Sequence, residues 1–227
     1  MGIKSKVKYL TSRFNYNLKV IHTYIFFKET YKIKRGYIHK NEYVHFDDTL
    51  NTDKWQLEVY SKAKEYAVKN NCKSIIDYGC GSAYKLMKYF ETDETIGIDV
   101  SPTYEFLKEK YPARDWLQFG DFDMNTLSAD IVICSDVIEH VLNPDDLLHN
   151  IKKIQNVKYI FISTPDRNLM PTEKFGPPFN PTHIREWSFE ELEEYVGTHF
   201  DIIEHIVSNK RQWTQLIIAK NKNQLNH

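Results

Sequence analysis

Short β-branched and apolar runs alternate with helical stretches from residue 74 onward. This alternation is typical of an α/β fold with a mainly parallel, doubly wound sheet. Seven runs predict strands, near residues 74–77, 95–99, 116–119, 131–135, 159–163, 202–208 and 215–220. Helices are expected at 55–68, 84–90, 104–110, 144–154 and 189–196. Only residues 209–214 separate the last two strands, so we expect these strands to pair as an antiparallel hairpin.

The length of the chain allows one substantial hydrophobic core. It has 227 residues, of which 41% are hydrophobic. We divide it into an N-terminal extension, one domain and a polar tail, at residues 1–50, 51–222 and 223–227. Residues 1–45 are basic and aromatic, with Glu29 as the only acid before Glu42. We predict a helical arm there whose aromatic side chains pack on the domain; the alternative is a basic surface for a phosphate-bearing substrate or a membrane.

Charge and cysteine usage argue against nucleic acid as a partner and against secretion. The formal net charge is −1, so the whole molecule has no strong field to attract nucleic acid. The three cysteines include no C-x-x-C pair, which favours a reducing compartment. The N-terminal residues lack the apolar stretch of a signal peptide, and no apolar run is long enough to span a membrane. We therefore expect a cytoplasmic protein without a transmembrane segment, and the sequence leaves its oligomeric state open.

The most specific segment is SIIDYGCGSAYKL, in which the first predicted strand ends at Asp77 and is followed by Gly79 and Gly81. Glycines let the backbone turn sharply and approach a ligand, and the next helix offers free N–H groups at its start. Asp99 ends the second strand, where a carboxylate can accept hydrogen bonds from ribose hydroxyls. A dinucleotide enzyme would share these features, but Tyr84 stands where its G-x-G-x-x-G motif needs the third glycine.

Four motifs in chain order resemble those of class I S-adenosylmethionine-dependent methyltransferases: Asp77-x-Gly79-x-Gly81, Asp99 after the second strand, Gly120-Asp121-Phe122 after the third, and CSDVIEHV after the fourth. The resemblance covers residues 55–220 and implies a Rossmann-like fold. It also implies an enzyme that transfers the methyl group of S-adenosylmethionine and leaves S-adenosylhomocysteine. Ala83 departs from the family, because many members have a third glycine there.

The resemblance also assigns roles to residues. The glycine loop would contact the amino-acid part of the cofactor, Asp99 the ribose, and Asp121 with Phe122 the adenine. Together with their neighbours, the expected cofactor-binding residues are Asp77, Gly79, Cys80, Gly81, Asp99, Val100, Asp121, Phe122 and Ser135. Cys80 has no visible base beside it, so we interpret it as a small packing residue.

Methyl transfer requires an aligned acceptor and, for a hydroxyl, a base. The loops after the fourth and fifth strands supply candidates for the catalytic residues: His140, His183, Asp136 and Arg185. His140 or His183 could be the base, since imidazole is partly neutral at physiological pH. Arg185 could hold a phosphate or carboxylate of the acceptor, or form a surface salt bridge with Glu186 or Glu190.

The same loops contain a potential O,O,N,N set for a divalent metal: Asp136, Glu139, His140 and His183. If the chain is helical after Ser135, the first three of these share one helix face. The segment looks similar to the Glu-x-x-Glu-His metal motif of small-RNA 2′-O-methyltransferases and some quinone-biosynthesis enzymes. Asp136 replaces the first Glu and has a shorter reach, so the interpretation that we favour is metal-free.

The acceptor class follows from resemblance alone. The segments GCGSAYKL, CSDVIEHV and GPPFNPTHIREWSF most resemble bacterial methyltransferases of surface-polysaccharide biosynthesis, such as capsule or lipopolysaccharide. Their acceptors would be sugar hydroxyls, including nucleotide-linked sugars, or phosphorus-containing groups. The Asn/Asp-Pro-Pro-aromatic motif of amino-directed nucleic-acid methylases is missing, which argues against base methylation. The alternatives are a small-metabolite O-methyltransferase, an RNA 2′-O-methyltransferase that uses the basic arm, and an inactive cofactor-binding subunit.

Overall fold

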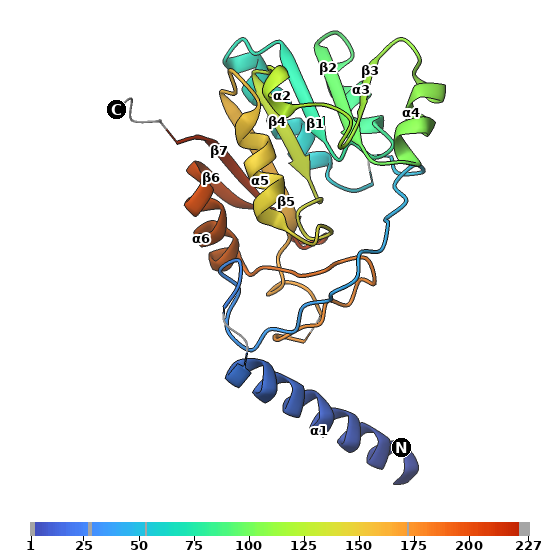
Figure 1. Cartoon of the computed structure of the whole chain (residues 1–227), viewed down its shortest axis with the longest axis vertical. Coiled ribbons are helices and arrows are strands. Elements are labelled where there is room, and N and C mark those ends of the chain that lie inside the picture. The colour runs from blue at the N-terminus through green and yellow to red at the C-terminus, as the bar shows by residue number, and fades with distance from the viewer. Residues whose placement is uncertain (1–2, 27–28, 53, 172, 223–227) are drawn as a thin grey trace.

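A computed structural model describes residues 3–26, 29–52, 54–171 and 173–222 (Figure 1). The tail expected at 223–227 lies outside these residues. One seven-stranded sheet has the order β3-β2-β1-β4-β5-β7-β6. Its strands are β1 (Ser74–Tyr78), β2 (Glu94–Asp99), β3 (Asp115–Gln118), β4 (Ile131–Ser135), β5 (Tyr159–Pro165), β6 (Phe200–Asn209) and β7 (Thr214–Asn221). Strands β1 to β5 are parallel to one another, and β7 is antiparallel to both β5 and β6, which confirms the predicted fold class and hairpin.

Helices cover both faces of this sheet (Figure 1). The covering helices are α2 (Leu57–Lys69), α3 (Tyr84–Phe90), α4 (Thr103–Lys110), α5 (Pro144–Lys153) and α6 (Phe189–His199), and a short 3-10 turn lies at Met124–Thr126. Helix α1 (Ile3–Phe26) projects away from the sheet. Buried residues of α2, α3 and α4 form one hydrophobic cluster. Those of α5 and α6 belong to a second cluster on the opposite face.

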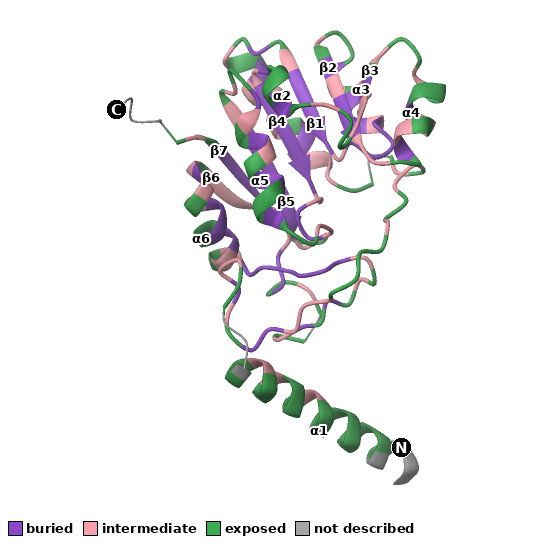
Figure 2. Ribbon diagram, in the orientation of Figure 1, coloured by how far each residue is buried: buried purple, intermediate pink, exposed green. Residues whose placement is uncertain are grey.

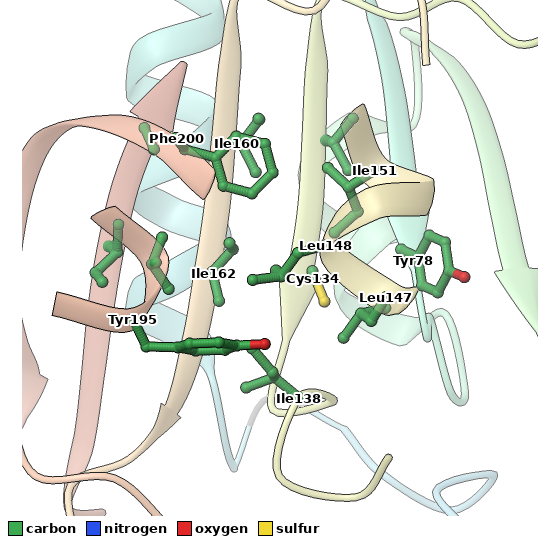
Figure 3. Close-up of a cluster of buried hydrophobic side chains, with 14 of the residues drawn as sticks. Tyr78, Cys134, Ile138, Leu147, Leu148, Ile151, Ile160, Ile162, Tyr195 and Phe200 are labelled. Carbon is green, nitrogen blue, oxygen red and sulfur yellow. The ribbon is translucent and has the colours of Figure 1, made fainter. Parts of the chain in front are cut away.

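The side chains of β4 alternate between the two clusters. Ile131 and Ile133 belong to the cluster of α2 to α4, whereas Val132 and Cys134 belong to that of α5 and α6. Figure 3 shows the second cluster, in which Leu148 lies between the two helices and the strands. Because all four of these β4 residues are fully buried, the strand is apolar throughout, as expected at the centre of a parallel sheet.

The strand order places a ligand-binding crevice at β1 and β4. The chain crosses from β1 to β2 and β3 on one side, then returns to β4 on the other side. In open α/β sheets, ligands bind outside the carboxyl ends of the strands where the order reverses in this way. The glycine loop after β1 and the Ser135–Asp136 segment after β4 therefore meet at one edge.

The N-terminal extension forms two different structures. Helix α1 exists as predicted, but much of its aromatic surface stays uncovered: Tyr9, Phe14 and Tyr24 are all more than half exposed (Figure 2). Residues 29–52 instead run as a loop along the domain, where Ile33 and Tyr37 are buried in the core. Within the described part of the chain, no helix is both long and apolar enough to cross a bilayer.

The spacing of Ser188 and Glu191 in the sequence predicts a capping box, and the start of α6 has one. The Ser188 hydroxyl accepts a hydrogen bond from the Glu191 amide at 3.3 Å, and the Glu191 carboxylate accepts one from the Ser188 amide at 3.0 Å. We expect Ser188→Ala to lower the free energy of unfolding by about 1 kcal/mol in urea denaturation. Ser188→Asp, which keeps an acceptor oxygen, should retain most of that stability, and an equal loss in both variants would contradict a capping role.

Candidate active site

A cavity of about 930 Å³ opens at the carboxyl ends of β1 and β4. It is large enough for a cofactor and an acceptor together, since ligand pockets usually measure about 300 to 1,000 Å³. Most of its lining is apolar and aromatic, with contributions from Tyr43, Phe46, Trp55, Tyr78, Phe119, Phe179 and Trp213. Its charged lining is acidic: Asp48, Asp99, Asp136, Glu139 and Asp146.

No lysine or arginine lines this cavity among the residues that the structure describes. The surrounding carboxylates favour a ligand with positive charge and disfavour an anion such as a pyrophosphate. The cavity therefore suits a sulfonium and ammonium cation better than a dinucleotide.

Two positions of the glycine loop require glycine, because the backbone there adopts a conformation that other residues rarely take. Gly79 and Gly81 have φ angles of +77° and +51°. A Cβ atom on Gly79 would collide with the Val137 side chain, and one on Gly81 would collide with the Asp48 carboxylate. Asp99 shapes the same loop by accepting hydrogen bonds from the backbone amides of Gly81 and Val100, each at 2.8 Å.

Asp48 reaches the glycine loop from the N-terminal extension. The Ser82 hydroxyl donates a hydrogen bond to the Asn51 carbonyl at 2.6 Å, which fastens this part of the extension to the loop. Burial raises the pKa of Asp48 to about 6, partly offset by the charge of Lys85. A cationic ligand beside Asp48 would favour its ionised form and reverse part of this shift.

Five of the predicted cofactor residues line the cavity: Gly79, Gly81, Asp99, Val100 and Ser135. The other four do not. Asp77 lies below the loop, where it accepts a hydrogen bond from the Tyr60 hydroxyl at 2.8 Å and burial raises its pKa to about 7. Cys80 is buried and burial raises its thiol pKa, in agreement with a packing role.

The predicted adenine contacts also lie elsewhere. Asp121 is exposed and Phe122 packs against the core, and neither lines the cavity. Phe119 lines it instead, with its ring 5.8 Å from that of Tyr78 in an edge-on arrangement.

The segment after β4 is a turn, so the helix face expected for Asp136, Glu139 and His140 does not form. Asp136 has a φ of +54°. Its carboxylate accepts hydrogen bonds from the Ser163 hydroxyl at 2.7 Å and the Gln56 amide at 3.1 Å. Asp136 thus connects β4, β5 and the segment before α2, and it lies outside the cluster of metal-ligating groups described below.

Backbone contacts bring His140 and His183 together. Their rings are 4.7 Å apart and edge-on, because the Ile184 amide donates to the Glu139 carbonyl at 2.8 Å. The Nδ1 atom of His140 lies 3.2 Å from the Thr182 carbonyl, which can only accept, so Nδ1 carries the proton. Burial, together with the nearby His183, lowers the pKa of His140 to about 3, and His140 is therefore neutral near pH 7.

The hydrogen bonds of His183 fix its tautomer. Its Nδ1 atom lies 2.8 Å from the buried Glu186 carboxylate. Asn180 accepts from Thr182 through its side-chain oxygen, so its NH₂ group is the one 2.9 Å from Nε2 of His183. Nδ1 of His183 thus donates to Glu186, and the lone pair of Nε2 accepts from Asn180, which lines the cavity together with His183.

Glu139 completes a three-residue cluster with the two histidines. One ligand atom from each of Glu139, His140 and His183 lies within 4.8 Å of the others. Glu139 is fully buried, and its carboxylate oxygens lack a hydrogen-bond partner among the described residues. Burial and the charge of Asp136 raise the pKa of Glu139 well above its ordinary value. One oxygen and two imidazole nitrogens fit a divalent metal, whose positive charge would favour the ionised form of Glu139.

Arg185 faces away from the cavity, so neither role expected for it is present. Its guanidinium donates to the carbonyls of Val141 and Leu142, each at 2.7 Å, and lies over the Tyr31 ring at 4.7 Å. It is 3% exposed. Arg185 therefore joins the turn after β4 to the loop that carries His183.

The contribution of residues 43–56 to the cavity was not predicted from the sequence. Tyr43, Phe46, Asp48 and Gln56 line it, and the Phe46 ring stacks on His140 at 5.4 Å. The dense run of aromatic, histidine and aspartate residues in YVHFDD was a usable signal, since such residues are enriched in ligand sites.

Residues 52–205 match the family model of a methyltransferase domain. The chain belongs to this family, the class I S-adenosylmethionine-dependent methyltransferases. A search of curated proteins finds no significant match to the methyltransferase.

Solved structures with the same fold include the methyltransferase domain of bacterial CtHen1-C, at 19% identity and a TM-score of 0.52 over 72% of this chain and 97% of that one. A Burkholderia thailandensis 1,6-didemethyltoxoflavin-N1-methyltransferase, bound to 1,6-didemethyltoxoflavin and S-adenosylhomocysteine, has 14% identity and a TM-score of 0.52 over 75% and 82% of the two chains. The small RNA methyltransferase HEN1 has 16% identity and a TM-score of 0.54 over 81% and 27%. At these identities the likeness establishes the fold alone.

Proposed function

We propose that the methyltransferase transfers a methyl group from S-adenosylmethionine to a neutral hydroxyl, with His183 as the general base. The observation that carries this proposal is the cavity itself. The glycine loop and His183 both line it, and its charged lining is acidic without a described lysine or arginine.

Residues that line the cavity suit each part of the methyl donor. Gly79 and Gly81 provide space that a Cβ atom would fill, and Asp48 and Asp99 lie beside that space. These carboxylates would hold the ammonium and the ribose hydroxyls, and Phe119 offers an aromatic edge for the adenine. When bound, S-adenosylmethionine supplies an electrophilic methyl carbon whose bond to sulfur breaks as the acceptor oxygen attacks.

Proton removal falls to His183. As the new C–O bond forms, the acceptor hydroxyl proton would move to Nε2, and Glu186 would stabilise the resulting imidazolium through Nδ1. The electron pair of the broken bond remains on sulfur. For this step the hydroxyl replaces the Asn180 amide as the hydrogen-bond partner of Nε2.

The acceptor that we favour is a sugar hydroxyl, as in surface-polysaccharide biosynthesis. Phe46 and Phe179 line the cavity near the two histidines, and flat aromatic rings can pack on the apolar faces of a sugar ring. A phosphorus-containing reacting group has less support, because Arg185 points elsewhere and no described cation lines the cavity. The same lack of cations weakens the case for an RNA acceptor.

A divalent metal is compatible with this site. Glu139, His140 and His183 would hold it, and it would polarise the acceptor hydroxyl directly. In that case Nε2 of His183 would be a ligand and would not act as the base. Activity in the presence of EDTA separates these two roles.

Calorimetric titration of the purified protein with S-adenosylmethionine and, separately, with NAD tests the proposal. We expect saturable binding of the methyl donor and no detectable binding of NAD, because the acidic lining opposes a pyrophosphate. Binding of NAD alone would overturn the proposal. Binding of the methyl donor would lead to a screen of neutral sugars, nucleotide-linked sugars and short RNAs for methyl transfer, in which sugars should react and RNA should not.

A further inference from the structure

Helix α1 carries an apolar stripe that the domain leaves uncovered. Leu10, Phe14, Leu18, Ile21 and Ile25 are each between 48% and 65% exposed. At 3.6 residues per turn, these five positions fall within an arc of about 80° around the helix axis. Figure 1 shows α1 projecting from the end of the molecule where the loops around residues 29–52 and 166–187 lie. A continuous exposed stripe of this kind marks an interaction surface.

The charges on α1 determine which partner fits that stripe. Its sequence contains lysine and arginine but no aspartate or glutamate. Lys6 and Arg13 flank the stripe on one side, while Lys8 and Lys19 lie toward the polar face, by the same helical geometry. A second copy of the helix would bring like charges together, and a nucleic acid would leave the apolar stripe in water. An anionic lipid surface satisfies both the stripe and the cations.

We infer that α1 lies in the interface of an anionic lipid bilayer, with the stripe directed toward the acyl chains. Tyr24, which is more than half exposed and lies beside the stripe by the same helical geometry, adds an aromatic ring of the kind that favours the headgroup region. This inference is independent of the reaction proposed above.

Contacts between α1 and the domain would hold the cavity close to the lipid surface. Arg13 forms an ion pair with Glu173, in the loop that also carries His183. Arg35 donates to the Ile25 carbonyl at 3.2 Å, and its guanidinium lies 4.9 Å from the centre of the Tyr24 ring. The loops that line the cavity are therefore the parts of the domain nearest to α1, so an acceptor held at a membrane would be within reach.

Sedimentation of the full chain with lipid vesicles tests the inference. We expect strong binding to vesicles of phosphatidylcholine mixed with phosphatidylglycerol, weak binding to phosphatidylcholine alone, and loss of binding as salt is raised. Phe14→Ser combined with Leu18→Ser should abolish binding, whereas Asn15→Ser on the polar face should not alter it. Lys6→Gln combined with Lys19→Gln should lower the partition coefficient about fivefold for each lysine removed.

Two measurements make the result decisive. Calorimetric titration with S-adenosylmethionine should give the same affinity in every α1 variant, which shows that the domain is intact. Sedimentation velocity without lipid should show the same monomeric species in the unchanged chain and in the stripe variant. Equal binding to both vesicle types, unchanged binding of the stripe variant, or a dimer that the stripe substitutions dissociate would each overturn the inference.

Discussion

Replacing His183 with alanine should lower kcat about 100- to 10,000-fold, while the affinity for S-adenosylmethionine stays within about twofold of that of the unchanged protein. The reason is geometric. Nε2 of His183 keeps its lone pair because Nδ1 donates to Glu186 at 2.8 Å. The glycine loop that would hold the cofactor follows β1, whereas His183 lies in the loop between β5 and α6. Single-turnover kinetics with a reactive acceptor would measure the rate, and calorimetry the affinity.

His140→Ala is the matched comparison. Its pKa near 3 makes His140 a poor proton acceptor, so this variant should lose much less activity than His183→Ala if the reaction needs only a base. If a metal is used, both variants and Glu139→Gln should fail together, and EDTA should inhibit the unchanged protein. Full activity of His183→Ala would remove this residue from the mechanism.

Replacing Asp99 with alanine should weaken S-adenosylmethionine binding about 10- to 100-fold, because hydrogen bonds to a charged group contribute about 1.5 to 3 kcal/mol. Asp99 lines the cavity and also holds the amides of Gly81 and Val100 at 2.8 Å. The substitution thus removes a ligand contact and loosens the loop. Calorimetric titration measures the loss.

Asp121→Ala provides the control for this experiment. Asp121 follows β3 as Asp99 ends β2, but it is exposed and does not line the cavity. The variant should bind S-adenosylmethionine like the unchanged protein. An equal effect of both substitutions would show that charge, and not position, determines the affinity, and it would undermine the assignment of Asp99.

Local sequence was sufficient for most of the fold. Each predicted strand overlaps an observed one, and α3 has its predicted bounds, because apolar periodicity reports burial directly. The capping box at Ser188 could also be predicted, because both of its partners lie within one turn of the helix. The packing of the N-terminal aromatic residues was predicted only in part: Tyr37 is buried in the core, but Phe14 and Tyr24 stay exposed, because composition does not indicate which aromatic residues the domain covers.

The site was less predictable because it depends on contacts between distant segments. Asp48 reaches the glycine loop across more than thirty positions of sequence, and Arg185 turns to the carbonyls after β4 because the loop places it there. Asp136 adopts a positive φ that no periodicity signals. Glu186 was named only as a partner for a surface ion pair, whereas it orients His183. Tertiary packing decides each of these roles.

The acidic lining of the cavity also has a consequence for turnover. A methyl donor enters with a positively charged sulfur, whereas after transfer the sulfur is a neutral thioether. Asp48 and Asp99 lie beside the glycine loop where we propose that the donor binds, and the attraction of these carboxylates for the sulfur centre would fall with that charge. The enzyme should therefore retain its spent cofactor less tightly than its fresh one, so that each round of chemistry promotes its own product release.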